Sequence, residues 1–252
     1  MPERTDHVWK TRAAAATYLE GIRGAFPLAL EQIDVMVRLI AACGRPVRRV
    51  LDLGCGDGVL AAAILERLPQ VEMVLADFSE PMLEAARNRF SAAGAVHYVL
   101  ADYGVPSWTR SVAGWAPYGA IVSGFSIHHQ PDDRKLAVYR EIFGLLSPGG
   151  VFVNIEHVSS PTDWLRGLQD ETFIDSLHRH RPDRSREEVA RFYFERPDKD
   201  ANILASVEQQ CAWLRDIGFT DADCYLKLFE LAVFGGRRPL SDRPDKMADS
   251  RV

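Results

Sequence analysis

Hydrophobic and polar positions follow two different periods between residues 47 and 158. Short runs rich in Val, Ile and Leu predict buried strands, and most are followed by segments whose apolar residues recur every three or four positions, as on one face of a helix. Strands that alternate with helices are typical of a parallel sheet covered by helices. The predicted strands cover residues 47–54, 71–78, 96–103, 118–129 and 149–158.

The alternation stops after the fifth predicted strand. Residues 158–205 are charged and aromatic, with helical patterns over 163–180 and 186–196 but no strand pattern. After one further helical pattern come two strand-like runs, 222–230 and 231–236, which are separated too briefly for a crossover connection. They therefore predict an antiparallel hairpin.

We expect an α/β fold with a Rossmann-like sheet of seven strands, mostly parallel, with an antiparallel strand in the C-terminal hairpin and helices on both faces. Residues 1–45 predict a helical cap near the ligand-binding rim of the sheet, and residues 46–238 the main domain. Residues 158–205 predict a helical lid over the carboxyl ends of the strands, where such sheets bind ligands. Residues 239–252 predict a disordered tail.

Composition narrows the classes of function. The 252 residues carry a formal net charge of −5, so a large basic surface for nucleic acid is not expected. The four cysteines are scattered and read as free thiols in a reducing compartment. No apolar run approaches the roughly 20 residues of a membrane span, and the first residues lack the apolar core of a signal peptide. These features predict a cytoplasmic protein without a membrane partner.

The first predicted strand ends in a glycine-rich turn, VLDLGCGDG, over residues 50–58. The third glycine of a dinucleotide fingerprint would fall on Val59, and no lysine follows as in a phosphate loop. Glycine still permits close approach of the backbone to a ligand. Because Asp52 and Asp57 stand in or beside the turn, the ligand part bound here is expected to be neutral or cationic, such as a sulfonium or an ammonium group.

Acidic residues also end the next two strands. Asp77 lies about 20 residues beyond the turn, where a carboxylate accepts hydrogen bonds from ribose hydroxyls. Asp102 is placed to accept from an adenine amino group, and Phe78 and Met82 are candidates for the walls of an adenine slot, or equally for the core. Together these residues predict a site for a nucleoside that carries a positive group.

The motifs LDLGCGDG, ADFSEPMLEAAR, ADYG, SGFSIHH and LLSPGGVFV resemble, in order and spacing, those of the class I S-adenosylmethionine-dependent methyltransferases. The closing pattern is similar to the branch that includes carboxy-S-adenosylmethionine synthases and their small-molecule methyltransferase relatives. The resemblance implies S-adenosylmethionine as cofactor and S-adenosylhomocysteine as product. The cofactor-binding residues that it implies are Asp52, Gly54, Cys55, Gly56, Asp77, Phe78, Met82, Asp102, Tyr103, Ser123 and Gly124.

Three histidines stand near the predicted rim. His128 and His129 follow the fourth strand, where one of them is a candidate general base because imidazole titrates near neutral pH. The alternative is a polar pair that only orders the loop, since many methyl transfers need no more than alignment of the reactants. His157 follows the fifth strand, but no spacing typical of metal ligands accompanies these histidines, and no metal is expected.

Tyr18 and Arg23 of the N-terminal helices, with Trp9, are candidates to close over the cofactor, and a packing role is an equal alternative for Tyr18 and Trp9. In the predicted lid, Arg191 or Arg196 is placed to meet a carboxylate of substrate or cofactor; in carboxy-S-adenosylmethionine synthases an arginine of this region holds the added carboxylate. Basic and acidic residues are interleaved here, so a solvated lid is favoured over a nucleic-acid surface.

The resulting hypothesis is a methyltransferase that acts on a small-molecule acceptor under a helical lid. Two alternatives stay open: a carboxy-S-adenosylmethionine synthase-like or other non-methylating enzyme, and a non-catalytic binding protein. The aromatic lid and hydrophobic N-terminal helices are also compatible with a homodimer.

Overall fold

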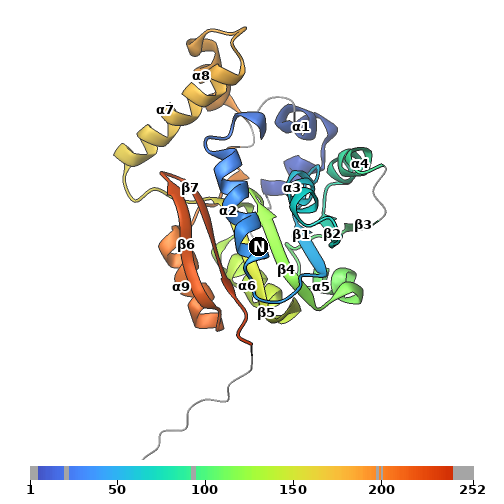
Figure 1. Cartoon of the computed structure of the whole chain (residues 1–252). Helices are drawn as coiled ribbons and strands as arrows, with labels where there is room; N and C mark the ends of the chain where they lie inside the picture. The colour runs from blue at the N-terminus through green and yellow to red at the C-terminus, as the bar shows by residue number, and fades with distance from the viewer. Residues whose placement is uncertain (1–4, 20–22, 92–94, 197–198, 200, 241–252) are drawn as a thin grey trace, which may run out of the picture.

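A single sheet of seven strands forms the centre of the computed structural model, which describes residues 5–19, 23–91, 95–196, 199 and 201–240 (Figure 1). The strand order is β3-β2-β1-β4-β5-β7-β6. The strands are β1 Arg49–Leu53, β2 Glu72–Asp77, β3 Val96–Leu100, β4 Tyr118–Gly124, β5 Leu146–His157, β6 Thr220–Leu228 and β7 Leu231–Arg237.

Strand direction follows the predicted pattern. Strands β1 to β5 pair in parallel, whereas β7 pairs antiparallel with both β5 and β6. The predicted fold class is therefore confirmed, including the C-terminal hairpin. The chain order reverses between β1 and β4, so the carboxyl ends of these neighbours form the switch point at which sheets of this type bind ligands.

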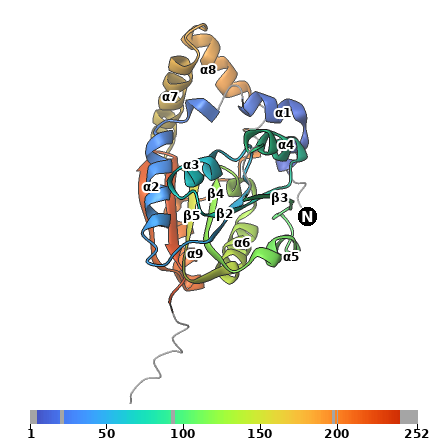
Figure 2. The same cartoon turned by 45° about the vertical axis from the view of Figure 1, so that its right-hand side comes forward.

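Helices cover both faces of the sheet (Figure 2). Apolar residues of α2, α3 and α4 pack on one face, and those of α5, α6 and α9 pack on the other. The central strands are apolar on both sides, as expected for strands buried on both faces. The helices are α1 Arg12–Thr17, α2 Ala29–Ala41, α3 Val59–Arg67, α4 Glu80–Arg89, α5 Trp108–Val112, α6 Asp132–Leu145, α7 Asp163–His180, α8 Arg186–Glu195 and α9 Val207–Ile217.

The N-terminal residues that the sequence assigns to one cap at the rim divide into two parts. A 3-10 helix, η1 (Thr5–Lys10), and α1 lie near the carboxyl ends of the strands, where α1 contacts α4 (Figure 2). Helix α2 instead packs on the sheet through Met36 and Ile40, which are fully buried. Its apolar stripe is the physical reason, because such a stripe gains most from burial against the sheet.

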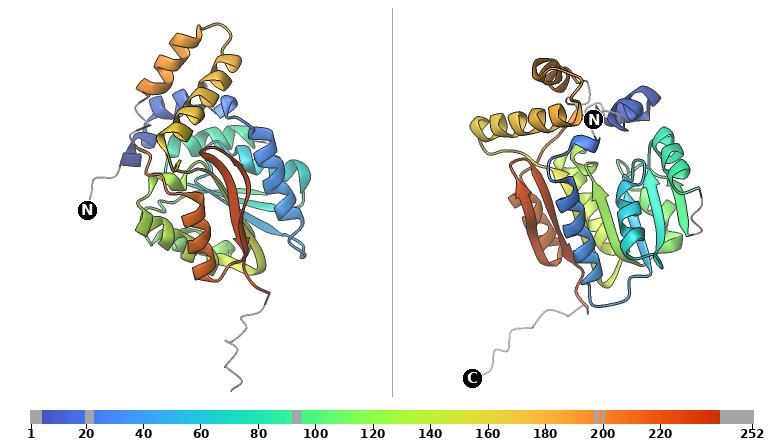
Figure 3. Two further views of the ribbon diagram at one scale, coloured as in Figure 1. Left: turned by 90° about the vertical axis from the view of Figure 1, so that its left-hand side faces the viewer. Right: turned by 45° about the horizontal axis from the view of Figure 1, so that its top comes forward.

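Helices α7 and α8 project beyond the sheet at the end where the site lies (Figure 3). Side chains Phe173, Ile174 and Leu177 of α7 pack with Val189 and Tyr193 of α8 in a small core that also includes Ala25 of the N-terminal segment. Residues 241–252 of the predicted tail lie outside the described residues. All four cysteines are free thiols, as expected. Among the described helices, none is long and apolar enough to cross a membrane.

Candidate functional site

A cavity of about 470 Å³ opens at the carboxyl ends of β1, β2 and β4. Its walls come from the glycine turn after β1, the end of β2, the loop after β4, the start of α2 and the N-terminal segment. Eleven of the candidate residues line it: Tyr18, Asp52, Gly54, Cys55, Gly56, Asp77, Phe78, Met82, Tyr103, Gly124 and His129.

The glycine turn owes its shape to backbone conformations that favour glycine. Gly54, Gly56 and Gly58 have φ values of 69°, 54° and 79°. Gly54 and the next residue both donate backbone hydrogen bonds to the carbonyl of Ala76, which ties the turn to β2. A Cβ on Gly54 would lie 2.0 Å from the Oγ of Ser126, so this position also needs glycine for lack of space.

Asp77 holds the turn and the end of β2 together. Its Oδ2 accepts from the backbone N–H of Gly56 at 2.9 Å, and its Oδ1 accepts from that of Ser79 at 2.8 Å. Burial raises the pKa of Asp77 to about 6, although these backbone hydrogen bonds oppose the increase. Each carboxylate oxygen still has a second lone pair with which to accept a hydrogen bond from a ligand.

Asp52 is almost completely buried, with 1% of its surface exposed. Its Oδ2 has no hydrogen-bond partner in the described part of the chain. Burial raises its pKa to about 8, and the charges of Asp77 and Asp57 act in the same direction. A cationic ligand group beside Asp52 would satisfy this oxygen, so the cavity fits the methionine ammonium and sulfonium of S-adenosylmethionine.

Asp57 differs from the sequence-based interpretation of the turn. Its carboxylate forms an ion pair with Arg89, whose Nε also donates to the Asp57 carbonyl at 2.8 Å. The negative charge of Asp57 is therefore already compensated within the protein. The case for a cationic ligand rests on Asp52 and Asp77.

Six candidate residues do not line the described cavity. Asp102 accepts from the N–H of Gly104, and the buried Ser123 donates to the carbonyl of Leu53. Arg191 is exposed on α8, and Arg196 lies over the rings of Phe173 and Tyr193. His128 and His157 belong to a polar cluster behind the cavity wall. The side chain of Arg23 lies outside the described residues.

His129 has a protein partner at each ring nitrogen. The indole N–H of Trp9 donates to Nε2 at 3.1 Å, and Nδ1 lies 3.1 Å from the carbonyl oxygen of Ala201. Because a carbonyl only accepts, Nδ1 must carry the proton and the ring is the neutral Nδ1–H tautomer. Burial lowers its pKa to about 3, and the adjacent His128 adds to this effect. These contacts favour a positioning role over a general base.

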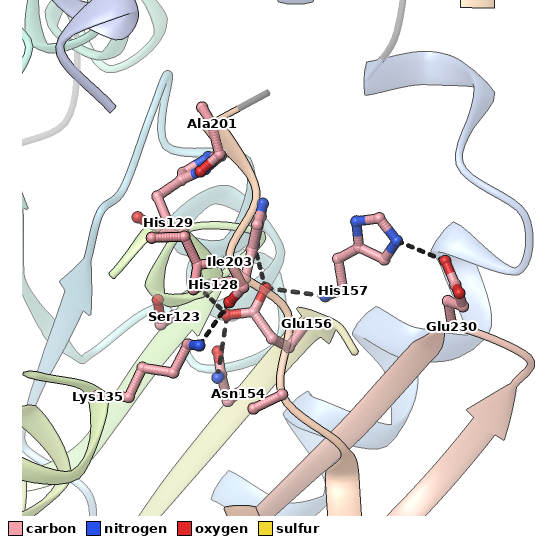
Figure 4. A network of polar contacts seen from close by, with 12 residues as sticks. Ser123, His128, His129, Lys135, Asn154, Glu156, His157, Ala201, Ile203 and Glu230 are labelled. Carbon is pink, nitrogen blue, oxygen red and sulfur yellow. Dashed lines mark hydrogen bonds and ion pairs between the residues drawn. The ribbon is translucent and has the colours of Figure 1, made fainter. Parts of the chain in front are cut away.

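Glu156 is the centre of the polar cluster behind the wall (Figure 4). This fully buried carboxylate accepts from the backbone N–H groups of His128 and His157 and lies 2.6 Å from Nδ1 of His128. Burial lowers the pKa of His128 and raises that of Glu156, so the pair favours a form with fewer charges. His157 in turn lies 3.0 Å from Glu230, in the turn between β6 and β7.

Residues near the same cluster hold in place the segment of the chain that follows α8. The backbone N–H of Ile203 donates to the carbonyl of His128, and the Lys135 ammonium donates to the carbonyl of Ile203. The sequence analysis did not identify Glu156 as important. An acid within the apolar run VFVNIEHV was the available signal, because a buried charge needs partners.

The protonation state of His129 gives a direct prediction. With imidazole nitrogens labelled with ¹⁵N, NMR should show one protonated and one unprotonated nitrogen for His129, unchanged between pH 8 and pH 5, because its pKa is about 3. His129→Gln assigns the signal. An imidazolium that appears between pH 7 and pH 5 would contradict this arrangement.

The comparisons with known proteins agree with this geometry. Residues 51–152 match a family described as "Methyltransferase domain". This part of the chain is similar to methyltransferase domains. It includes the glycine turn, Asp77 and the loop after β4. The predicted resemblance to the class I methyltransferases is confirmed, whereas the carboxy-S-adenosylmethionine synthase branch stays a prediction.

Curated relatives are similar to this chain over about half of its length. An uncharacterized methyltransferase of Mycobacterium tuberculosis is 35% identical over 127 residues, which is 50% of this chain and 56% of the relative. A trans-aconitate 2-methyltransferase of Acidovorax ebreus is 34% identical over 125 residues, which is 48% of this chain and 43% of that protein. The chain thus spans about half the length of these relatives.

Solved structures share the fold over nearly the whole chain. An O-methyltransferase family protein from Burkholderia thailandensis superposes with a TM-score of 0.64 at 18% identity, over 94% of this chain and 62% of that one. Human N-acetylserotonin methyltransferase in complex with S-adenosylmethionine superposes with a TM-score of 0.59 at 13% identity, over 94% of this chain and 59% of that one.

Proposed function

We propose that this protein transfers the methyl group of S-adenosylmethionine to a small-molecule acceptor. The observation that carries the proposal is the placement of Asp52 and Asp77 beside a glycine turn within a methyltransferase domain. A buried carboxylate with one oxygen that lacks a partner among the described residues fits an ammonium or sulfonium group and disfavours a pyrophosphate.

Each part of the cofactor has candidate partners. Asp77 would accept from the ribose hydroxyls, while Asp52 and the glycine turn would hold the methionine part. Phe78 and Met82 would form walls of the adenine slot. The remaining cofactor roles are proposed for Cys55, Asp102, Tyr103, Ser123 and Gly124.

Bound S-adenosylmethionine would supply an electrophilic methyl group on its sulfonium sulfur. The protein's part is to align the acceptor with that group and to exclude water, which accounts for much of the rate in such transfers. His129 would act by fixing Trp9 against the loop after β4 rather than by taking a proton. The proton of the acceptor group would then be removed before or after the methyl transfer.

The lid is proposed to consist of α7, α8 and the N-terminal segment, with Tyr18, Arg23, His157, Arg191 and Arg196 as candidate lid residues. A carboxylated cofactor would need a cation close to the sulfur. No Lys or Arg lines the cavity among the described side chains, which supports methyl transfer over the synthase alternative.

Ionisation of Asp52 predicts how binding depends on pH. To pair with the ammonium group of S-adenosylhomocysteine, Asp52 must be charged, yet its pKa of about 8 in the free protein keeps it largely protonated below that pH. Binding therefore releases a proton, and affinity should rise from pH 6 to pH 8 by up to about tenfold per unit. Calorimetry should show this slope, and Asp52→Asn should flatten it. A pH-independent affinity in the unaltered protein would contradict the role of Asp52.

Catalysis is tested separately from binding. The full chain is incubated with methyl-labelled S-adenosylmethionine and a panel of small hydroxyl, amine, thiol and carbon acceptors, and label transfer is followed by mass spectrometry. Transfer to one acceptor class is expected. Tight cofactor binding without transfer to any class would favour the non-catalytic alternative.

A further inference from the structure

Four aromatic side chains form one continuous wall of the cavity. Trp9, Tyr18, Phe26 and Phe125 all line it. The ring centroids of Trp9 and Tyr18 are 5.5 Å apart, those of Tyr18 and Phe26 are 6.4 Å apart, and Phe26 stacks on Phe125 at 4.1 Å with an angle of 17° between the rings. Leu30 and Ile33 of α2 extend this apolar surface. The wall presents ring faces and edges suited to another ring.

Phe125 adopts a backbone conformation that is unfavourable for a bulky residue. Its φ is 48°, in the left-handed region, although it has a large side chain. A hydrogen bond of 2.7 Å from its backbone N–H to the carbonyl of Ile155 holds it there. Strained residues of this kind gather at ligand sites, where the surrounding structure maintains them. Here the strain accompanies the stacking of the Phe125 ring on Phe26 in the cavity wall.

The charges of the cavity disfavour an anionic acceptor. The described lining side chains include the carboxyl groups of Asp6, Asp52, Asp57 and Asp77, and none of the lining side chains is a lysine or an arginine. Arg89 compensates Asp57 from outside the lining. His129 adds no positive charge, because both its nitrogens hold neutral partners. A carboxylate or phosphate would enter without a described cation to pair with it.

Gln32 adds one polar feature beside the aromatic wall. Its Nε2 donates to the carbonyl of Pro27 at 2.7 Å, which fixes the orientation of the amide. Its Oε1 has no hydrogen-bond partner in the described residues, although the side chain is 98% buried and lines the cavity. A ligand hydroxyl or amine could satisfy this oxygen, whereas a carboxylate oxygen could not.

We infer that the methyl acceptor is an uncharged aromatic molecule that bears a hydroxyl or amino group, and that Phe125 determines this specificity. The ring packs on the wall formed by Trp9, Tyr18, Phe26 and Phe125, and the donor group lies toward Gln32. The inference rests on the proposed function, because it concerns the acceptor half of the same cavity.

Matched probes test the inference without knowledge of the natural acceptor. The full chain is first saturated with S-adenosylhomocysteine, and binding of 2-naphthol, 2-naphthoate and decahydro-2-naphthol is then measured by calorimetry near neutral pH. We expect 2-naphthol to bind, 2-naphthoate to bind at least about tenfold more weakly because like charges repel, and the saturated alcohol to bind several-fold more weakly because it lacks a π face.

Variants connect the result to Phe125. Phe125→Leu should weaken 2-naphthol binding by about fivefold, with the affinity for S-adenosylhomocysteine unchanged. Phe229→Leu, at a half-buried site in the turn between β6 and β7 with a similar φ of 50° and outside the described cavity lining, should change neither.

Two outcomes overturn the inference in a protein that binds S-adenosylhomocysteine: naphthoate binding as tight as naphthol binding, or failure of naphthol to bind. Equal naphthol binding by Phe125→Leu would overturn the role of that residue. Failure to bind S-adenosylhomocysteine itself would instead contradict the proposed function.

Discussion

Asp77→Asn is expected to weaken the binding of S-adenosylhomocysteine by at least about 100-fold. Hydrogen bonds to a charged group are each worth about 1.5–3 kcal/mol, and the ribose would donate two of them to this carboxylate. The amide would also present an N–H group to Gly56 or Ser79, whose backbone N–H groups need an acceptor. Titration calorimetry of the variant and the unaltered protein measures the loss.

Two comparisons make the Asp77 result specific. Glu80→Gln changes an exposed carboxylate on the neighbouring helix and should leave affinity unchanged. Circular dichroism reports whether Asp77→Asn remains folded, and Asp77→Glu offers a second variant that keeps the charge and should retain more affinity than the amide. A folded Asp77→Asn variant with unchanged affinity would show that the ribose lies elsewhere.

Glu156→Ala is expected to lower the free energy of unfolding by about 3–5 kcal/mol, because removing the central acceptor of a buried polar network leaves several donors without partners. The loss would strip an acceptor from the backbone N–H groups of His128 and His157 and from the imidazole of His128. Urea denaturation of the protein measures the change.

Glu156→Gln separates charge from hydrogen bonding. Its amide oxygen can still accept from one backbone N–H, so the loss should be smaller than with alanine. Glu72→Ala removes a carboxylate with a third of its side chain exposed, paired with Arg49, and should cost less than about 1 kcal/mol. A Glu156→Ala protein as stable as Glu72→Ala would contradict the importance of the buried cluster.

The strands of the parallel part of the sheet were predictable because their burial on both faces leaves continuous apolar runs in the sequence. The runs around β1 and β2 and the glycine turn between β1 and α3 are local features, set by hydrophobicity and backbone freedom. The hairpin could also be predicted from local sequence, because a short connection permits only antiparallel pairing. The position of α2 on the sheet was not predictable, since an amphipathic pattern does not specify which surface the helix packs against.

The lining of the cavity was predictable where acidic residues end the strands, as at Asp52 and Asp77. Long-range contacts were not predictable. The Arg89 partner of Asp57 lies 32 residues away, and the Trp9 partner of His129 lies 120 residues away. The left-handed conformation of Phe125 could not be predicted from the sequence either, because phenylalanine does not favour this conformation.

Native mass spectrometry of the full chain, with S-adenosylmethionine titrated in and NAD as the matched control, tests whether the cavity binds a nucleoside with a positive group. We expect a one-to-one complex with S-adenosylmethionine or S-adenosylhomocysteine and none with NAD at the same concentration. Binding of NAD in preference, or no binding of S-adenosylmethionine, would contradict the assignment of Asp52 and Asp77 to a cationic nucleoside.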